Sequence, residues 1–154
     1  QTLPVAAGPL VLFYARWIPG GHSPSGSLHF FGGLKISAGG KALPWTRDTA
    51  DVFAFHINVP EGVRTLDIEA QYLTPTDSPQ GGVAITQEML RLNWLAAALY
   101  PAGYYIRGLD VDARVNLPEG VQHGTGPDAS TLTAATGHFQ PLAAASRARS
   151  PRSA

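Results

Sequence analysis

The sequence predicts an all-β fold, an antiparallel β-sandwich of roughly eight strands. Short stretches in which apolar and polar residues alternate recur along the chain, and this period is typical of strands that bury one face. Glycine and proline account for 17 and 13 of the 154 residues, and they gather between these stretches, as turns require. An apolar run near the N-terminus is too short for a helix and has breakers on both sides, which also favours a strand.

That apolar run, residues 10–17, predicts the first long strand. Its Leu, Val, Phe, Tyr and Trp residues are branched or aromatic and therefore common in strands. We expect the run to be buried on both faces and to stop at Pro19. The loop that follows contains Gly20 and His22, and we expect the strand to carry this loop to a surface, where loops on rigid scaffolds bind partners.

The other clear strands are predicted at residues 27–37, 42–45, 51–59, 66–72 and 108–117. Gly32 and Gly33 interrupt the first of these, so we expect a bulge there. Residues 38–41 predict a hairpin turn, and residues 60–62 predict a second turn. The stretch 108–117 alternates apolar residues with charged or polar ones, which indicates a strand with one solvent face.

Residues 86–100 are compatible with two structures. Thr86 would cap a helix, and the Glu, Met, Leu and Ala residues that follow favour one. Leu90, Leu92 and Trp94 instead alternate with polar residues, as they would in a strand. The residues alone leave both interpretations open.

Length and composition indicate one domain without a nucleic-acid footprint or a membrane span. The chain has 11 basic and 11 acidic residues and no cysteine, so a basic binding face and thiolate zinc sites are not expected. No apolar run approaches the roughly 20 residues of a membrane-spanning helix. We assign residues 1–142 to a single β-sandwich domain and expect the basic, Ala/Arg/Ser-rich tail 143–154 to be flexible.

The histidines do not form a recognisable catalytic motif. His22, His29, His56, His123 and His138 include no pair at the H-E-x-x-H spacing, which places two zinc ligands on one helix face. No nucleophile elbow and no phosphate-binding loop occurs either. We therefore expect no catalytic residue and no metal ligand in this chain.

Other polar and aromatic groups have structural interpretations. Asp67 and Glu69 are two residues apart, as on the solvent face of a strand. Trp17, Trp45 and Trp94 could form a stacking platform for sugar. Each lies in or beside an apolar run, however, so packing in the core is the favoured interpretation.

Several motifs, taken together, resemble a known family. W-x-P-G-x-H begins at Trp17, P-W-x-R-D at Pro44, D-V-x-A-F-H at Asp51, and N-W followed by L-Y-P-A-G begins at Asn93. In this order they resemble the N-terminal domain of the glycyl-aminopeptidase family of bacterial zinc metallopeptidases, from about residue 1 to residue 126. Family members also have a thermolysin-like catalytic domain bearing H-E-x-x-H and a PDZ-like domain, which this sequence does not match.

The resemblance implies a non-catalytic domain that packs on the catalytic domain of a parent peptidase and helps to wall its substrate cleft. Zinc would belong to that absent catalytic domain, so no cofactor is expected in this chain. The resemblance also favours strand over helix for residues 86–100. We expect the contact to involve two exposed elements, the loop after the first long strand and the corner near residue 100. Their residues are Trp17, Pro19, Gly20 and His22 in the loop, and Tyr100, Pro101 and Gly103 in the corner.

The sequence departs from the family pattern at both ends. Family domains begin with one or more strands before the segment that matches Gln1, so this chain is expected to lack an N-terminal edge strand. An exposed edge invites pairing with a second copy. The tail 143–154 replaces an acidic and apolar linker, as a truncation or a shifted reading frame would do.

The alternative interpretation is a free-standing secreted β-sandwich that binds sugar or protein through exposed aromatic rings. An enzyme acting through this chain alone is disfavoured. The first residues, QTLPVAAGP, resemble a mature or trimmed end. We favour export or a periplasmic location in bacteria, with the cytoplasm as the alternative.

Overall fold

The computed structural model describes residues 1–17, 22–24, 26–74, 83–86, 89–104 and 108–117. Ten strands and two short 3-10 turns lie in this part of the chain. The strands are β1 (Thr2–Pro4), β2 (Gly8–Tyr14), β3 (Phe31–Ala38), β4 (Lys41–Ala42), β5 (Trp45–Arg47), β6 (Ala54–Val59), β7 (Thr65–Tyr72), β8 (Val83–Ile85), β9 (Leu90–Leu92) and β10 (Leu99–Pro101). The turns are η1 (Leu28–Phe30) and η2 (Trp94–Ala96).

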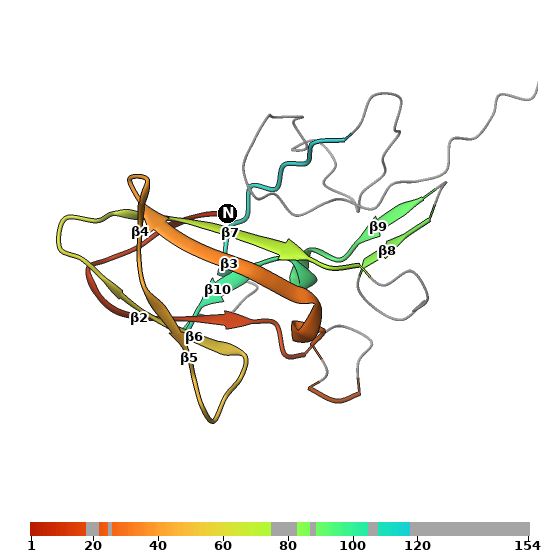
Figure 1. The fold of residues 1–154 in the computed structure, drawn as a ribbon, viewed down its shortest axis with the longest axis horizontal. Coiled ribbons are helices and arrows are strands. Elements are labelled where there is room, and N and C mark those ends of the chain that lie inside the picture. The colour runs from red at the N-terminus through yellow and green to blue at the C-terminus, as the bar shows by residue number, and fades with distance from the viewer. Residues whose placement is uncertain (18–21, 25, 75–82, 87–88, 105–107, 118–154) are drawn as a thin grey trace, which may run out of the picture.

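The strands form two antiparallel four-stranded sheets and a separate two-stranded ribbon (Figure 1). The first sheet has the order β1-β7-β3-β4, and the second has the order β10-β2-β6-β5. Strands β8 and β9 pair only with each other within the described residues, and their ribbon projects beyond the two sheets in Figure 1. The predicted all-β fold with antiparallel sheets is confirmed.

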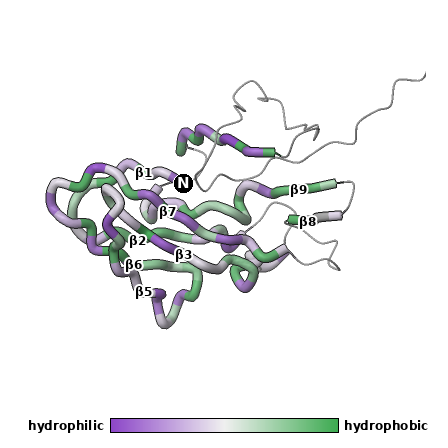
Figure 2. Tube along the Cα trace, turned by 45° about the horizontal axis from the view of Figure 1, so that its top comes forward, coloured by the Kyte–Doolittle hydropathy of each residue, from purple (hydrophilic) through white to green (hydrophobic). Residues whose placement is uncertain are grey.

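The two sheets share one hydrophobic core. Tyr14 from β2 lies with its ring centroid 5.1 Å from that of Phe31 in β3, so the rings join the two sheets directly. Each fully buried Leu, Ile or Phe side chain in such a core contributes about 1.5–3 kcal/mol. The cluster consists of Leu12, Tyr14, Leu28, Phe31, Ile36, Phe55, Ile57, Val59, Leu66, Ile68 and Leu99. Figure 2 shows the hydrophobic stretches of β2 and β6, while β7 carries hydrophilic residues between its buried ones.

The predicted bulge at the glycine pair is present and sets which side chains of β3 face the core. The register with β7 shifts between Gly32 and Lys35, and Gly33 has a φ of +61°. Phe31 and Ile36 are both buried, although a regular strand would place residues five apart on opposite faces. The extra residue restores the alternation, so Lys35 lies outside and Ile36 inside.

The first long strand is shorter and less buried than predicted. It ends at Tyr14 rather than at residue 17. Only one face is fully buried, since Leu12 and Tyr14 are buried whereas Val11 and Phe13 are half-buried. The prediction of burial on both faces is therefore wrong: an apolar run does not distinguish a strand buried on both faces from one whose second face is partly open.

The predicted strand at 42–45 is wrong in its boundaries, because this segment crosses from one sheet to the other. Lys41 and Ala42 pair with β3 across the expected turn at Gly39 and Gly40. Trp45 already pairs with Ile57 of β6 in the second sheet. Two short edge strands in two sheets thus replace one return strand.

The strand predicted at 108–117 is wrong: no strand is present among these residues. The alternation matches burial only in part: Val115 is buried and the even-numbered residues from Asp110 to Asn116 are exposed, but Val111, at one of the apolar positions, is 76% exposed. A strand also needs a partner edge for its backbone groups. This segment instead lines a groove beside β1 and β10, with no ladder to either.

Residues 86–100 contain no α-helix in their described part. Strands β9 and β10 lie at either end of Leu90–Pro101, as the family resemblance favoured, and the single turn η2 separates them. Asn93 caps this turn, because its side-chain oxygen accepts a hydrogen bond from the Leu95 backbone nitrogen at 3.1 Å. The turn carries Ala96 and Ala97 into a second small cluster with Val83.

Candidate interface groove at the β1 and β10 edges

A groove of about 600 Å³ lies between strand β1 of the first sheet and strand β10 of the second. Strand β1 is the edge of the first sheet, and β10 is the edge of the second. Residues 109–112 and Arg114 line the same groove. The lining is mostly apolar and includes Leu3, Leu99, Tyr100 and Val111, a composition typical of surfaces that bind ligands or other domains.

Gln1 connects the two sheets at the base of this groove. Its side-chain Nε2 donates a hydrogen bond to the Leu99 carbonyl at 2.6 Å, and its Oε1 accepts one from the Leu99 backbone nitrogen at 3.1 Å. Its backbone carbonyl accepts from the Ile68 nitrogen at 2.7 Å, in the other sheet. Sequence reasoning missed this residue, because nothing in a terminal glutamine indicates that its amide will pair with a strand edge.

The predicted corner contributes to the groove through β10. Tyr100 and Pro101 both line it, and Tyr100 pairs with Phe13 in the register of β10 and β2. Gly103 lies in an exposed turn with a φ of +85°. The Ala102 nitrogen donates to the Val11 carbonyl at 2.8 Å, which ties the corner to the middle of β2.

The predicted loop after β2 is not brought to the same place. Strand β10 runs antiparallel to β2, so the corner at Gly103 leads away from the end of β2 at which this loop begins. Trp17 is 61% exposed, and His22 is exposed as well. Pro19 and Gly20 lie outside the described residues. The predicted core packing is wrong for Trp17, whereas Trp45 and Trp94 are half-buried and each packs against a core cluster.

The outer faces of the two sheets differ. Val11, Phe13 and Tyr100 are half-buried on the outer face of the second sheet, and the rings of Phe13 and Tyr100 are 6.0 Å apart. On the outer face of the first sheet, Lys35 and Glu69 are exposed. The apolar surface beside the groove therefore belongs to β2 and β10.

Two exposed apolar residues near this surface were not predicted from the sequence. Val111 is 76% exposed and Tyr104 is 64% exposed. The alternation of residues 109–117 assigned Val111 to an inner face, so the pattern pointed the wrong way. Asp112, which also lines the groove, forms a 2.8 Å ion pair with Arg114.

Two titratable side chains of the described residues, Tyr14 and His56, form close polar contacts. The Tyr14 hydroxyl donates to the Ala96 carbonyl at 2.9 Å, and burial raises the pKa of Tyr14 above its usual range. His56 Nε2 lies 2.8 Å from Asp48 Oδ2 on an exposed strand face.

No group of three or more His, Asp or Glu side chains in the described part of the chain could hold a metal ion. Among these residues there is also no helix long and apolar enough to cross a membrane.

Hydrogen bonds hold Asp48 in its charged form. Its carboxylate accepts from the backbone nitrogens of Asp51 and Ala50 and pairs with His56. These bonds, chiefly the one from Asp51, lower the pKa of Asp48 to about 2. This carboxylate closes the turn between β5 and β6 and belongs to the framework.

Comparison with known proteins connects this fold to a peptidase family. A family profile described as the peptidase M61 N-terminal domain matches residues 1–146. A solved structure of an aminopeptidase N family protein from Idiomarina loihiensis superposes with a TM-score of 0.54 at 17% identity, over 66% of this chain. The chain spans 16% of the length of that structure, and the likeness shows a shared fold. No match was found among functionally curated proteins.

The family match confirms the resemblance to the N-terminal domain of a peptidase family that the motifs predicted. It extends over 146 residues, beyond the end of the motifs near residue 126. The chain belongs to the peptidase M61 N-terminal domain family.

Proposed function

We propose that this domain is a non-catalytic part of a zinc metallopeptidase, which packs on the catalytic domain and helps to wall its substrate cleft. The apolar surface beside the β1 and β10 groove is the observation that supports this proposal. Val11, Phe13 and Tyr100 leave apolar area on the outside of the second sheet, and exposed Val111 lies at the adjoining groove. Contiguous exposed apolar area of this kind marks an interaction surface.

The difference between the outer faces of the two sheets indicates which of them contacts the catalytic domain. A domain interface needs apolar area that water leaves on contact. The first sheet offers Lys35 and Glu69 on its outer face, and burying such charges without partners is costly. We therefore assign the contact to the β2 and β10 side, with residues 109–114 at its border.

Binding to a purified catalytic domain of the same peptidase family tests this proposal. Val111→Asp places a charge at the exposed tip of the surface and is expected to weaken binding about tenfold, which corresponds to about 1.4 kcal/mol. Val52→Asp is the matched control, because Val52 is 47% exposed in the turn between β5 and β6. Isothermal titration calorimetry measures both. Equal weakening by both variants, or no binding of the unsubstituted chain, would contradict the proposal.

Peptide hydrolysis in the same samples tests the non-catalytic role. We expect the isolated chain to cleave no aminopeptidase substrate, with or without added zinc. We expect the catalytic domain to be more active or more stable when this domain is bound. Turnover by the isolated chain with stoichiometric zinc would overturn this assignment.

A binding module is the second candidate, and the exposed rings of Trp17 and Tyr104 favour it. Such rings stack on sugar faces or on partner side chains. Tryptophan fluorescence titrated with soluble β-linked oligosaccharides tests this function. A saturable change that Trp17→Ala removes would support a sugar-binding module over the packing role.

A further inference from the structure

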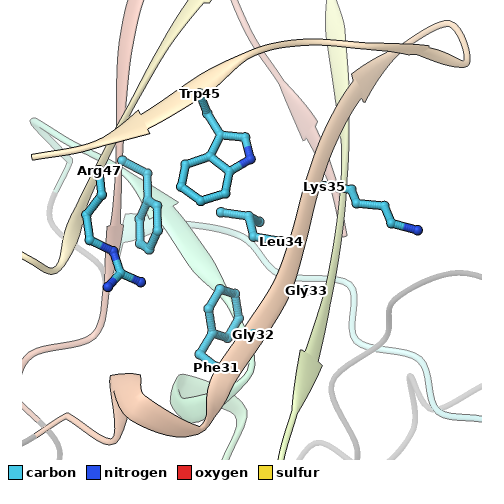
Figure 3. A pocket seen from close by; sticks show the side chains of 8 residues that line it. Phe31, Gly32, Gly33, Leu34, Lys35, Trp45 and Arg47 are labelled. Atoms are coloured by element: carbon cyan, nitrogen blue, oxygen red, sulfur yellow. The ribbon is translucent and has the colours of Figure 1, made fainter.

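A second groove, of about 420 Å³, lies on the opposite side of the sandwich (Figure 3). It is bounded by β3 of the first sheet and β5 of the second, whereas β1 and β10 lie at the other ends of their sheets. Phe31, Leu34, Trp45 and Phe55 line its interior. In Figure 3 the labelled side chains of Leu34 and Trp45 point into this space, while Lys35 points away from it.

The edge of β3 is open along this groove. Strand β4 pairs only with Ser37 and Ala38, and the Ile36 carbonyl accepts from the Leu43 nitrogen at 2.8 Å. Backbone groups alternate in direction along a strand, so those of Leu34 point to the same edge as those of Ile36. No described strand pairs with Leu34. An extended segment lying in line with β4 would meet the Leu34 backbone nitrogen and carbonyl there.

The floor of the groove is aromatic. The rings of Trp45 and Phe55 meet edge to face with centroids 5.5 Å apart, and Phe31 lies 6.5 Å from Phe55. Gly32 adds no side chain at the rim, and a Cβ built there meets nothing within 4 Å. A partner backbone can therefore approach β3 closely, while one of its apolar side chains covers the half-buried Trp45 ring.

One cation at the rim has no acidic partner. The Arg47 guanidinium lies over the Phe55 ring at 5.3 Å, and no ion pair involves it within the described residues. The neighbouring Asp48 is already engaged by Ala50, Asp51 and His56. Arginine pairs with carboxylates through two parallel hydrogen bonds, so the open fork of Arg47 suits a carboxylate.

We propose that this groove binds an extended polypeptide segment that carries a carboxylate. The segment adds to the open edge of β3 in line with β4, as in β-strand addition. Its backbone pairs with Leu34, an apolar side chain packs on Trp45, and its carboxylate meets Arg47. The carboxylate belongs either to an Asp or Glu side chain or to a chain terminus, and the test separates these sources.

Fluorescence anisotropy with labelled octapeptides of alternating valine and threonine tests the proposal on the full chain. One peptide carries a central glutamate and an amidated end, the second carries glutamine and a free terminal carboxylate, and the third carries lysine and an amidated end. We expect saturable binding of the first or second with a Kd below about 1 mM. Preference for the first assigns a side-chain carboxylate, and preference for the second assigns a chain terminus. Equal binding of the lysine peptide, or no saturation by any of them, would overturn the proposal.

A substitution in the protein tests the carboxylate contact, and a modification of the peptide backbone tests strand addition. Arg47→Glu is expected to weaken the carboxylate peptide about tenfold, whereas Lys41→Glu, the same charge change on β4, is expected to leave its Kd within about twofold. N-methylation of alternate peptide residues removes backbone donors without altering the protein, and it is expected to weaken binding at least about tenfold. Unchanged affinity after Arg47→Glu or after N-methylation contradicts the proposal, as does a dimer of the chain that the peptide cannot dissociate.

Discussion

Gln1 holds Leu99 as a neighbouring strand would hold it, although the contact is made by a side chain. The glutamine amide donates to the Leu99 carbonyl at 2.6 Å and accepts from its nitrogen at 3.1 Å. The Gln1 backbone is meanwhile bonded to Ile68 in the other sheet. One residue thus fixes the separation of the two edges that border the interface groove.

Gln1→Ala is expected to lower the free energy of unfolding by about 1–2 kcal/mol, because two partly buried backbone groups lose their partner. Urea unfolding followed by tryptophan fluorescence measures the change. Thr2→Ala serves as the control, since it removes one exposed hydrogen bond to Asp67 and is expected to cost less than about 0.5 kcal/mol. Equal costs for the two variants would refute the bridging role of Gln1.

Tyr14→Phe tests a hydrogen bond that a fully buried side chain makes to the backbone of η2. The Tyr14 side chain is 0% exposed, and its hydroxyl donates to Ala96. Removing the hydroxyl leaves that carbonyl unpaired, so the expected loss is about 1–2 kcal/mol. Tyr100→Phe, at a half-buried position, is expected to change stability by less than about 0.5 kcal/mol. If Tyr14→Phe leaves the free energy of unfolding unchanged, the Ala96 carbonyl must find another hydrogen-bond partner.

The lowered pKa of Asp48 predicts that the folded chain loses stability in acid. Its pKa falls to about 2 in the folded chain, against about 3.9 in an unfolded chain. The unfolded state therefore takes up the proton first, so the contribution is present above about pH 4 and is lost as the pH falls towards 2. Asp48→Asn is expected to flatten the dependence of the urea midpoint on pH in this window. Asp112→Asn, in an exposed pair with Arg114, should leave that dependence in place; if it flattens the curve equally, Asp48 is not the source.

Gly33→Ala tests the bulge that sets the two faces of β3. The positive φ of Gly33 costs a residue with a Cβ about 1–2 kcal/mol. The nearest atom to the new Cβ is the flexible Gln71 side chain at 3.4 Å, so backbone strain dominates. Gly32→Ala is the matched control, because its Cβ meets nothing within 4 Å and its φ needs no glycine. Thermal unfolding should shift only for Gly33→Ala, and an equal shift in the control would argue against a strained bulge.

The strands with strict alternation and clear turns were predicted well from the sequence. Phe55, Ile57 and Val59 lie on one buried face of β6, and the turn with Gly62 follows it with a φ of +81°. Alternation succeeded there because both neighbours of β6 are present in its sheet. In residues 109–117 the same pattern predicted neither the exposure of Val111 nor the absence of a strand, since a hydrophobic period carries no information about a partner edge.

The candidate surface was predicted only in part. Tyr100 and Pro101 line the groove, and their motif pointed to them. Gln1 had no sequence signal and the alternation wrongly placed Val111 inside, because the positions of both residues depend on which edges the fold leaves open. A single sequence shows the strands, whereas the spaces between sheet edges arise only when those strands assemble.

Hydrogen exchange of this chain, with and without a catalytic domain of the same peptidase family, is the most direct test of the packing role. Mass spectrometry would follow amide protection peptide by peptide. We expect added protection in residues 99–104 and 108–114, which border the apolar surface, and unchanged exchange in β7. Protection confined to β3 and β7, or no protection anywhere, would contradict the central claim that the β2 and β10 side of this domain contacts the peptidase.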